Sequence, residues 1–343
     1  MRTQIFLHIG MHKTGTTFLQ NLFRRRRKQL LQADSLLFPE TGLPLTENVS
    51  PKLDGFPGHN GFVRISSRKT MIGKLAAEIA TCSPDRVFIS AENLSNVKFQ
   101  FCKPLVEDLE LIGSVSIILV VRRQDKWIES YYRQRVAGNK KGETRDFWTF
   151  LKEEGPLLLD YGVRYQQWRQ TPFSGKFFVA SYDDLTAHDA LMRWFCEILQ
   201  VSNSGFSLHL DKAPTYPSLT RLDTEITRLV NLIPDLAPAK RNELLRHIYR
   251  VGILADAPFV SDDLYEELRK CYEPKNKKIV DEWAIHPASE FINWRRTEEQ
   301  VRWDVNLSTI SSKLTAASDG LADMRHTTRR KKRLFELLKT TFG

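Results

Sequence analysis

Short apolar stretches alternate with amphipathic segments through the first 200 residues of the chain. The apolar stretches have the length and the valine, isoleucine and phenylalanine content of buried strands. They comprise residues 4–9, 86–91, 115–121 and 176–181. Helical spacing of apolar positions follows in residues 18–31, 69–81, 103–112, 127–132, 147–168 and 186–199. This alternation predicts βαβ units, and therefore an α/β fold with a parallel sheet flanked by helices on both faces.

The pattern becomes helical beyond about residue 202. The predicted helices cover residues 220–232, 238–251, 262–271 and 274–284. Because no clean linker precedes them, we predict a single domain in three parts: an α/β core (1–205), a helical C-terminal extension (206–307) and a polar, basic tail (308–343).

The first apolar strand runs into a turn that contains Gly10 and Gly15 and leads at once into a helix. Glycines let the backbone approach an anion, and a new helix offers unpaired N–H groups at its positive end. Lys13, Thr14, Thr16 and Thr17 add one charge and three hydroxyl groups. We interpret the segment as a phosphate-binding loop.

The position of the lysine argues against a kinase or an ATPase. The Walker pattern places lysine directly after the second glycine, followed by a magnesium-binding serine or threonine. In this chain Thr16 follows Gly15, and Lys13 lies two places before that glycine. No strand ends in an obvious metal-binding aspartate. A phosphotransferase with an unusual loop remains as an alternative hypothesis.

Three further candidate residues follow predicted strands. Glu92, Arg122 and Tyr182 come after the strands at 86–91, 115–121 and 176–181. In open parallel sheets, ligands bind at the carboxyl ends of the strands. We therefore expect these residues to gather with the loop at Gly10.

Arg122 and Ser130 form a second candidate phosphate site. The serine lies eight residues after the arginine, in the following helix, so both can face one phosphate. The planar guanidinium binds phosphate through two parallel hydrogen bonds.

In order and spacing, these motifs resemble the sulfotransferases that use 3′-phosphoadenosine 5′-phosphosulfate. The Lys-Thr-Gly-Thr-Thr segment looks like the family's 5′-phosphosulfate loop, and Arg122 with Ser130 looks like its 3′-phosphate motif. The resemblance covers about residues 3–200 and implies a sulfotransferase fold. It implies that the nucleotide contacts His12, Lys13, Thr14, Gly15, Thr16, Thr17, Phe18, Arg122, Ser130 and Tyr182.

The resemblance also implies a catalytic arrangement without a metal. Glu92 stands where cytosolic members carry a histidine base, as glutamate does in some carbohydrate-modifying members. Lys13 would balance charge on the leaving oxygen. His59, in a polar loop at residues 38–67 that we expect over the acceptor site, is the rival base. His12 would either support the sulfuryl group or fill the turn.

One feature of the cytosolic members is missing: their Arg-Lys-Gly loop, which closes over the nucleotide. Residues 212–218 are our candidate replacement. The acceptor suggested by the glutamate base and the open polar loop is a hydroxyl of a carbohydrate.

A net charge of +10 favours an anionic partner. Two basic runs contribute, at residues 24–28, where the first predicted helix closes, and at 329–333. They could bind nucleic acid, which makes a nucleic-acid-binding protein the second function hypothesis, or they could be solvated helix ends. We favour the enzyme, without a nucleic-acid partner.

The remaining composition indicates an ordinary globular chain. Four scattered cysteines predict free thiols rather than a disulfide framework or a metal site. No apolar run approaches the roughly 20 residues of a membrane span. Because a strand begins almost at the first residue, we expect no signal peptide and a cytoplasmic location.

Overall fold

The computed structural model describes residues 2–44, 58–63, 68–96, 99–138, 142–188, 190–202, 219–250 and 258–295. The candidate segment 212–218, the basic run 329–333 and the tail 308–343 lie outside these ranges. The chain divides into two units, and each contains separate stretches of sequence. The first comprises Met1–Gln124, Leu158–Thr215 and Leu268–Trp294, and the second comprises Asp125–Leu157, Tyr216–Glu267 and Arg295–Gly343. The predicted single domain with a core, a helical extension and a tail stays a prediction.

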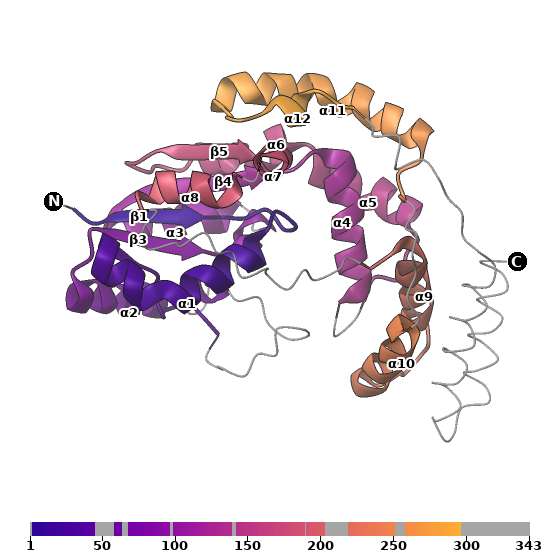
Figure 1. Ribbon diagram of the computed structural model, residues 1–343, viewed down its shortest axis with the longest axis horizontal. Helices are drawn as coiled ribbons and strands as arrows, with labels where there is room; N and C mark the ends of the chain where they lie inside the picture. The colour runs from indigo at the N-terminus through magenta and orange to yellow at the C-terminus, as the bar shows by residue number, and fades with distance from the viewer. Residues whose placement is uncertain are drawn as a thin grey trace, which may run out of the picture. The chain divides into compact units, whose positions relative to one another are not determined.

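The first unit contains a sheet of five parallel strands in the order β2-β3-β1-β4-β5 (Figure 1). The strands are β1 (Gln4–His8), β2 (Leu36–Leu37), β3 (Arg86–Ser90), β4 (Ser114–Val121) and β5 (Phe177–Ser181). The predicted parallel α/β architecture is thus confirmed. Strand β2 was not predicted, because its two residues are too few to show a pattern of apolar positions.

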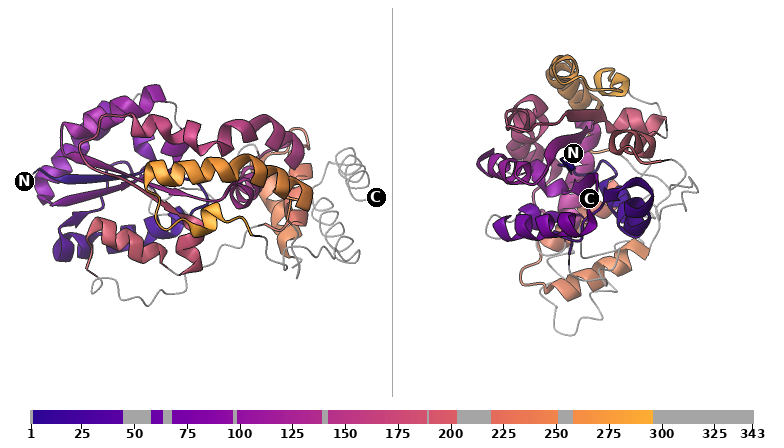
Figure 2. Two further views of the ribbon diagram at one scale, coloured as in Figure 1. Left: turned by 90° about the horizontal axis from the view of Figure 1, so that it is seen from above. Right: turned by 90° about the vertical axis from the view of Figure 1, so that its left-hand side faces the viewer.

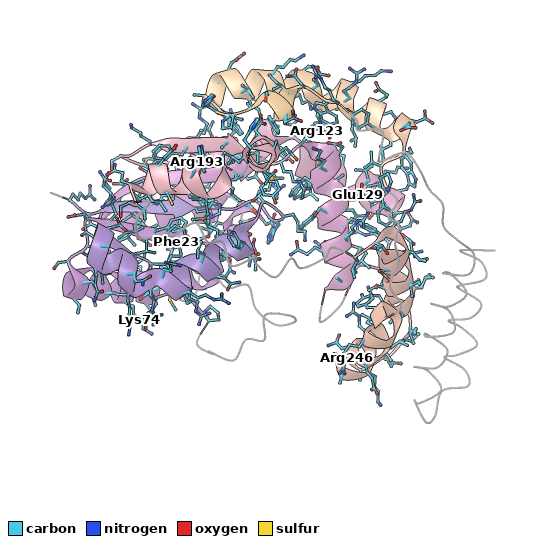
Figure 3. The ribbon with its side chains drawn as sticks, in the orientation of Figure 1. Phe23, Lys74, Arg123, Glu129, Arg193 and Arg246 are labelled. Atoms are coloured by element: carbon cyan, nitrogen blue, oxygen red, sulfur yellow. The ribbon has the colours of Figure 1, made fainter. Side chains whose placement is uncertain are left out.

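Helices cover both faces of this sheet (Figure 2). One face carries α1 (Thr16–Asp34) and α8 (Leu191–Leu199), and the other carries α2 (Arg68–Cys82), α3 (Phe99–Glu110) and α6 (Tyr161–Arg169). Phe23 of α1 packs between the helix and the sheet, whereas Lys74 of α2 is exposed (Figure 3).

Alternate residues of the strands face α1 and α8. Their shared core contains Phe6, Phe88, Ile118 and Val120 from the strands with Phe23, Leu30, Phe195 and Leu199 from the helices. Residues 24–28, predicted to close the first helix, instead lie within α1, which continues to Asp34. The reason is that Leu30, beyond the basic run, is buried in this core and extends the helix by tertiary packing.

Two predicted helix boundaries are different in the structure. The predicted helix 147–168 is divided into α5 (Phe147–Leu159) and α6, because the side chain of Asp160 accepts the N–H of Val163 and caps α6. The two helices predicted at 262–271 and 274–284 are one, α11 (Asp262–Trp283), with Pro274 inside. The φ angle of proline is compatible with a helix, but proline has no backbone N–H, so α11 lacks one hydrogen bond at Pro274.

A loop-and-helix segment follows α11 in the first unit. Both carboxylate oxygens of Asp184, in α7 (Tyr182–Ala187), accept backbone N–H groups of α12 (Ser289–Ile292), from Glu290 and Phe291. These two hydrogen bonds hold α12, near the end of the described chain, beside β5, the last strand of the sheet.

The second unit is helical. It comprises most of α4 (Gln124–Ala137), then α5, α9 (Arg221–Asn231), α10 (Pro238–Arg250) and the beginning of α11. Tyr132, Phe147 and Phe259 form an aromatic cluster in its core, with ring centroids 5.1 to 5.3 Å apart. No helix in the described part of either unit has the length and apolarity needed to cross a membrane.

Candidate active site

The carboxyl ends of β1, β3, β4 and β5 place the predicted loop, Glu92, Arg122 and Tyr182 at one edge of the sheet. The strands are in register there: His8 of β1 lies opposite Ser90 of β3 and Ile118 of β4. The predicted gathering of residues at this edge is therefore observed within the first unit.

The loop after β1 is a tight turn with three left-handed residues, Gly10 (φ 83°), Lys13 (φ 65°) and Gly15 (φ 74°). A Cβ atom added to Gly10 would lie 2.5 Å from the Cα atom of Glu92. Gly10 is therefore required both for its backbone angle and for this close approach. The hydroxyl of Thr14 donates to the carbonyl of Met11 at 2.6 Å, so it closes the turn.

The amino end of α1 has no feature that would oppose an anion. Gly15 is its N-cap residue and supplies no side-chain cap, and the first turn contains no acidic residue. The first N–H groups of a helix have no intrahelical acceptor, and the helix dipole is positive there. Phe18, another predicted contact, packs on the core beneath this turn. The local charge and backbone fit a phosphate or sulfate group.

Glu92 is the chemically unusual group of the site. The residue is 2% exposed, and its Oε2 accepts the hydroxyl of Thr16. Burial raises the pKa of Glu92 from 4.5 to about 7, although the Thr16 hydrogen bond and the charge of Lys13 oppose the rise. A carboxylate with this pKa can accept a proton near neutral pH.

His12 lies beside this carboxylate as a neutral ring. Its Nδ1 is 3.6 Å from Oε1 of Glu92. Burial, followed by the charges of Arg164 and Lys13, lowers the pKa of His12 to about 4. At neutral pH the contact with Glu92 is therefore not an ion pair, and His12 offers the site one N–H donor at most.

His59 has a structural environment. The backbone N–H of Ser90 donates to its Nδ1 at 3.1 Å, and its Nε2 donates to the carbonyl of Pro39 at 2.9 Å. Both ring nitrogens are thus engaged, and burial lowers the pKa of His59 to about 4. This geometry favours Glu92 over His59 as the base.

The described end of the long polar loop packs behind β3. Gly58 lies so close to Gln20 and Ser90 that an added Cβ would be 2.3 Å from Nε2 of Gln20. In this part the loop belongs to the core, and the expectation that the loop covers the acceptor site stays a prediction. Residues 45–57 and 64–67 of the loop lie outside the described ranges.

A buried network around Ser90 holds the strand end that carries Glu92. The Ser90 hydroxyl contacts Nδ1 of His8 at 2.9 Å and accepts the side-chain amide of Gln20 at 3.0 Å. Sequence reasoning missed both partners. Their only signal was position, since His8 ends the first strand and Gln20 interrupts the apolar stripe of the first helix.

Arg122 lies against the loop. Its Nη1 donates to the carbonyl of Lys13 at 3.1 Å, and its guanidinium carbon is 5.2 Å from the centre of the Tyr182 ring. Asp183 was not predicted: one oxygen is 3.8 Å from Nε of Arg122, and the other accepts the backbone N–H of Arg123 at 2.8 Å (Arg123 is labelled in Figure 3). Arg122 thereby joins the loop to Tyr182.

Ser130 lies on α4, in the second unit. The positions of the two units relative to one another are not determined. Its pairing with Arg122 therefore stays a prediction.

Comparison of the chain with family models, with curated proteins and with solved structures gave no match. Within the described ranges, no group of three or more histidine, cysteine, aspartate or glutamate side chains could hold a metal ion.

We expect the protein to lose stability steeply between pH 7 and pH 4. Burial lowers the pKa of His8 to about 3 and that of His12 and His59 to about 4, from 6.5. The unfolded chain therefore binds more protons in this range, and each histidine destabilises the fold by roughly 2–3 kcal/mol as pH falls. Urea unfolding at several pH values measures the slope.

The variant His59→Asn should flatten this slope, since asparagine does not titrate. Glu92 acts in the opposite sense, because its raised pKa favours the folded state at acidic pH. A wild-type stability that stays constant from pH 7 to pH 4 would contradict the burial of three neutral histidines.

Proposed function

We propose that the chain transfers a sulfuryl group from 3′-phosphoadenosine 5′-phosphosulfate to a hydroxyl of a carbohydrate acceptor. The observation that carries the proposal is the contact between Glu92 and the phosphate loop. A buried carboxylate with a pKa of about 7 accepts a hydrogen bond from the first residue of α1, beside Lys13. A proton acceptor and an anion cradle thus share one site.

The chemistry follows from this contact. Glu92 takes the proton of the acceptor hydroxyl as its oxygen forms a bond to sulfur. The bond between sulfur and the bridging oxygen breaks, and its electron pair leaves on the 5′-phosphate of the nucleotide. The ammonium of Lys13 and the N–H groups of α1 stabilise that developing charge.

The nucleotide specificity is proposed to reside in Arg122. This guanidinium is partly exposed beside Tyr182 and is hydrogen-bonded to the loop. It is suited to the 3′-phosphate, which AMP and ATP lack. Tyr182 offers an aromatic ring for the adenine.

We expect 3′-phosphoadenosine 5′-phosphate to stabilise the protein far more than AMP or ATP at equal concentration. A ligand at about 100 times its Kd adds about 2.7 kcal/mol to the free energy of unfolding. Thermal shift and calorimetric titration measure the difference. Equal shifts with this ligand and with AMP would refute the 3′-phosphate assignment.

Arg122→Ala should remove most of the difference between the two nucleotides, because the phosphate loses a charged, bidentate donor. Arg122→Lys is the matched control, since it keeps the charge but not the planar fork. Retained AMP binding in the alanine variant would show that the loop is intact. Transfer itself is tested with labelled donor and pooled carbohydrate acceptors.

A further inference from the structure

The hydroxyl of Thr16 lies between two acceptors. In the structure it donates to Oε2 of Glu92. Thr16 is also the first residue of α1, where the phosphosulfate of the proposed donor would bind. A hydroxyl carries a single proton and can donate one hydrogen bond. The hydroxyl therefore serves either Glu92 or the bound anion, and not both.

We propose that Thr16 is a positioning residue. Its hydroxyl is hydrogen-bonded to Glu92 while the site lacks donor, and it donates to the donor's phosphate instead when the donor binds, which releases Glu92. This inference rests on the proposed function. Released, Oε2 of Glu92 is available to the hydroxyl of the acceptor. Donor binding thus prepares the base, and the acceptor is deprotonated only when a sulfuryl group is present to receive its oxygen.

The geometry makes this exchange local. Thr16 is 3% exposed and Glu92 is 2% exposed, so water does not replace the lost bond freely. The backbone of Gly10 lies close to the Cα, Cβ and carbonyl oxygen of Glu92, so the backbone of Glu92 is held in place beside the loop. A short rotation of one hydroxyl is sufficient.

The charged groups around Glu92 act in the same direction. Lys13 in the loop lowers the pKa of Glu92, as does the bond from Thr16. His12, held neutral by burial, Arg164 and Lys13, lies 3.6 Å from the other carboxylate oxygen. A bound anion would screen Lys13 as well as remove the Thr16 bond, so both changes raise the pKa of Glu92 and make its deprotonated form a stronger base.

The test follows the titration of Glu92 by carbon-13 NMR of its side-chain carboxyl, assigned by its loss in Glu92→Gln. Without nucleotide, Thr16→Val should raise the pKa of Glu92 by roughly one pH unit, because a hydrogen bond to the charged form is lost. Thr16→Ser should restore the wild-type value. With saturating 3′-phosphoadenosine 5′-phosphate, wild type and Thr16→Val should titrate alike.

Thr17→Val is the matched control, since it removes a neighbouring hydroxyl and should leave the nucleotide-free titration of Glu92 unchanged. Thr16→Ala replaces the valine variant if the latter does not fold. A difference between wild type and Thr16→Val that persists with nucleotide bound would overturn the proposal, as would no difference without nucleotide. Either result leaves the proposed function standing, whereas failure of wild type to bind the nucleotide would overturn both.

Discussion

Glu92→Gln should lower the rate of sulfuryl transfer by roughly 10²- to 10⁴-fold, the usual contribution of a general base. Glutamine keeps the size of the side chain, and its amide oxygen can still accept the hydroxyl of Thr16. The amide cannot take a proton from an acceptor. Initial rates with labelled donor at saturating acceptor measure the loss.

Nucleotide binding is the first control for this variant, because Glu92 is proposed to face the acceptor. Its affinity for 3′-phosphoadenosine 5′-phosphate should therefore stay near the wild-type value. His59→Asn is the second control: with both ring nitrogens of His59 engaged in the core, its main effect should be on stability. An active Glu92→Gln together with an inactive, folded His59→Asn would reverse the two roles.

Stability provides an independent check on the environment of Glu92. Its folded pKa of about 7 lies above the ordinary 4.5, so the folded state binds more protons and the contribution of Glu92 to stability falls as pH rises through this range. Because the three buried histidines raise stability over the same range, the free energy of unfolding should rise from pH 5 to pH 8 by roughly 2–3 kcal/mol less in wild type than in Glu92→Gln. Identical pH dependence would show that the carboxylate is solvated.

Lys13→Ala should reduce kcat by roughly 10²- to 10³-fold, the scale observed when one donor to a developing oxyanion is removed. The ammonium matters most when the bridging oxygen becomes negative, so the loss falls on turnover more than on nucleotide affinity. Steady-state kinetics and nucleotide titration separate the two quantities.

The backbone at Lys13 makes alanine a clean replacement. Its φ of 65° is in the left-handed region, where alanine and lysine are comparably disfavoured, so the substitution removes the charge without relaxing the loop. Lys13→Arg keeps a positive charge and should retain part of the rate. A variant that binds nucleotide weakly but turns over normally at saturation would limit Lys13 to binding.

Four of the five strands could be predicted from sequence because the strands of a parallel sheet covered on both faces are continuous apolar runs. The short strand β2 could not be predicted, since Leu36 and Leu37 pair only where β3 passes them. The local sequence pattern also did not predict the full length of α1. Its basic interior resembles a helix end, although helical apolar spacing reaches residue 31; in the structure Leu30 is buried in the core and the helix continues to Asp34.

The candidate site, too, could be predicted from the sequence only in part. Gly10, Lys13 and Gly15 could be placed in one tight turn from sequence, since a turn between strand and helix uses neighbouring residues. The strand-end rule also predicted that Glu92 and Arg122 lie near that loop. Asp183, Gln20 and His8 were missed as partners, because no short-range pattern connects them with the residues that they contact.

The sequence by itself determined the parallel α/β core, the tight turn between β1 and α1, and the edge of the sheet where the candidate residues meet. Each depends on local periodicity or on residues close together in the chain. Only the tertiary structure decided the raised pKa of Glu92 and the buried, hydrogen-bonded environment of His59. A pKa depends on burial and on partners such as Thr16, 76 residues from Glu92, and both arise only when distant segments pack together.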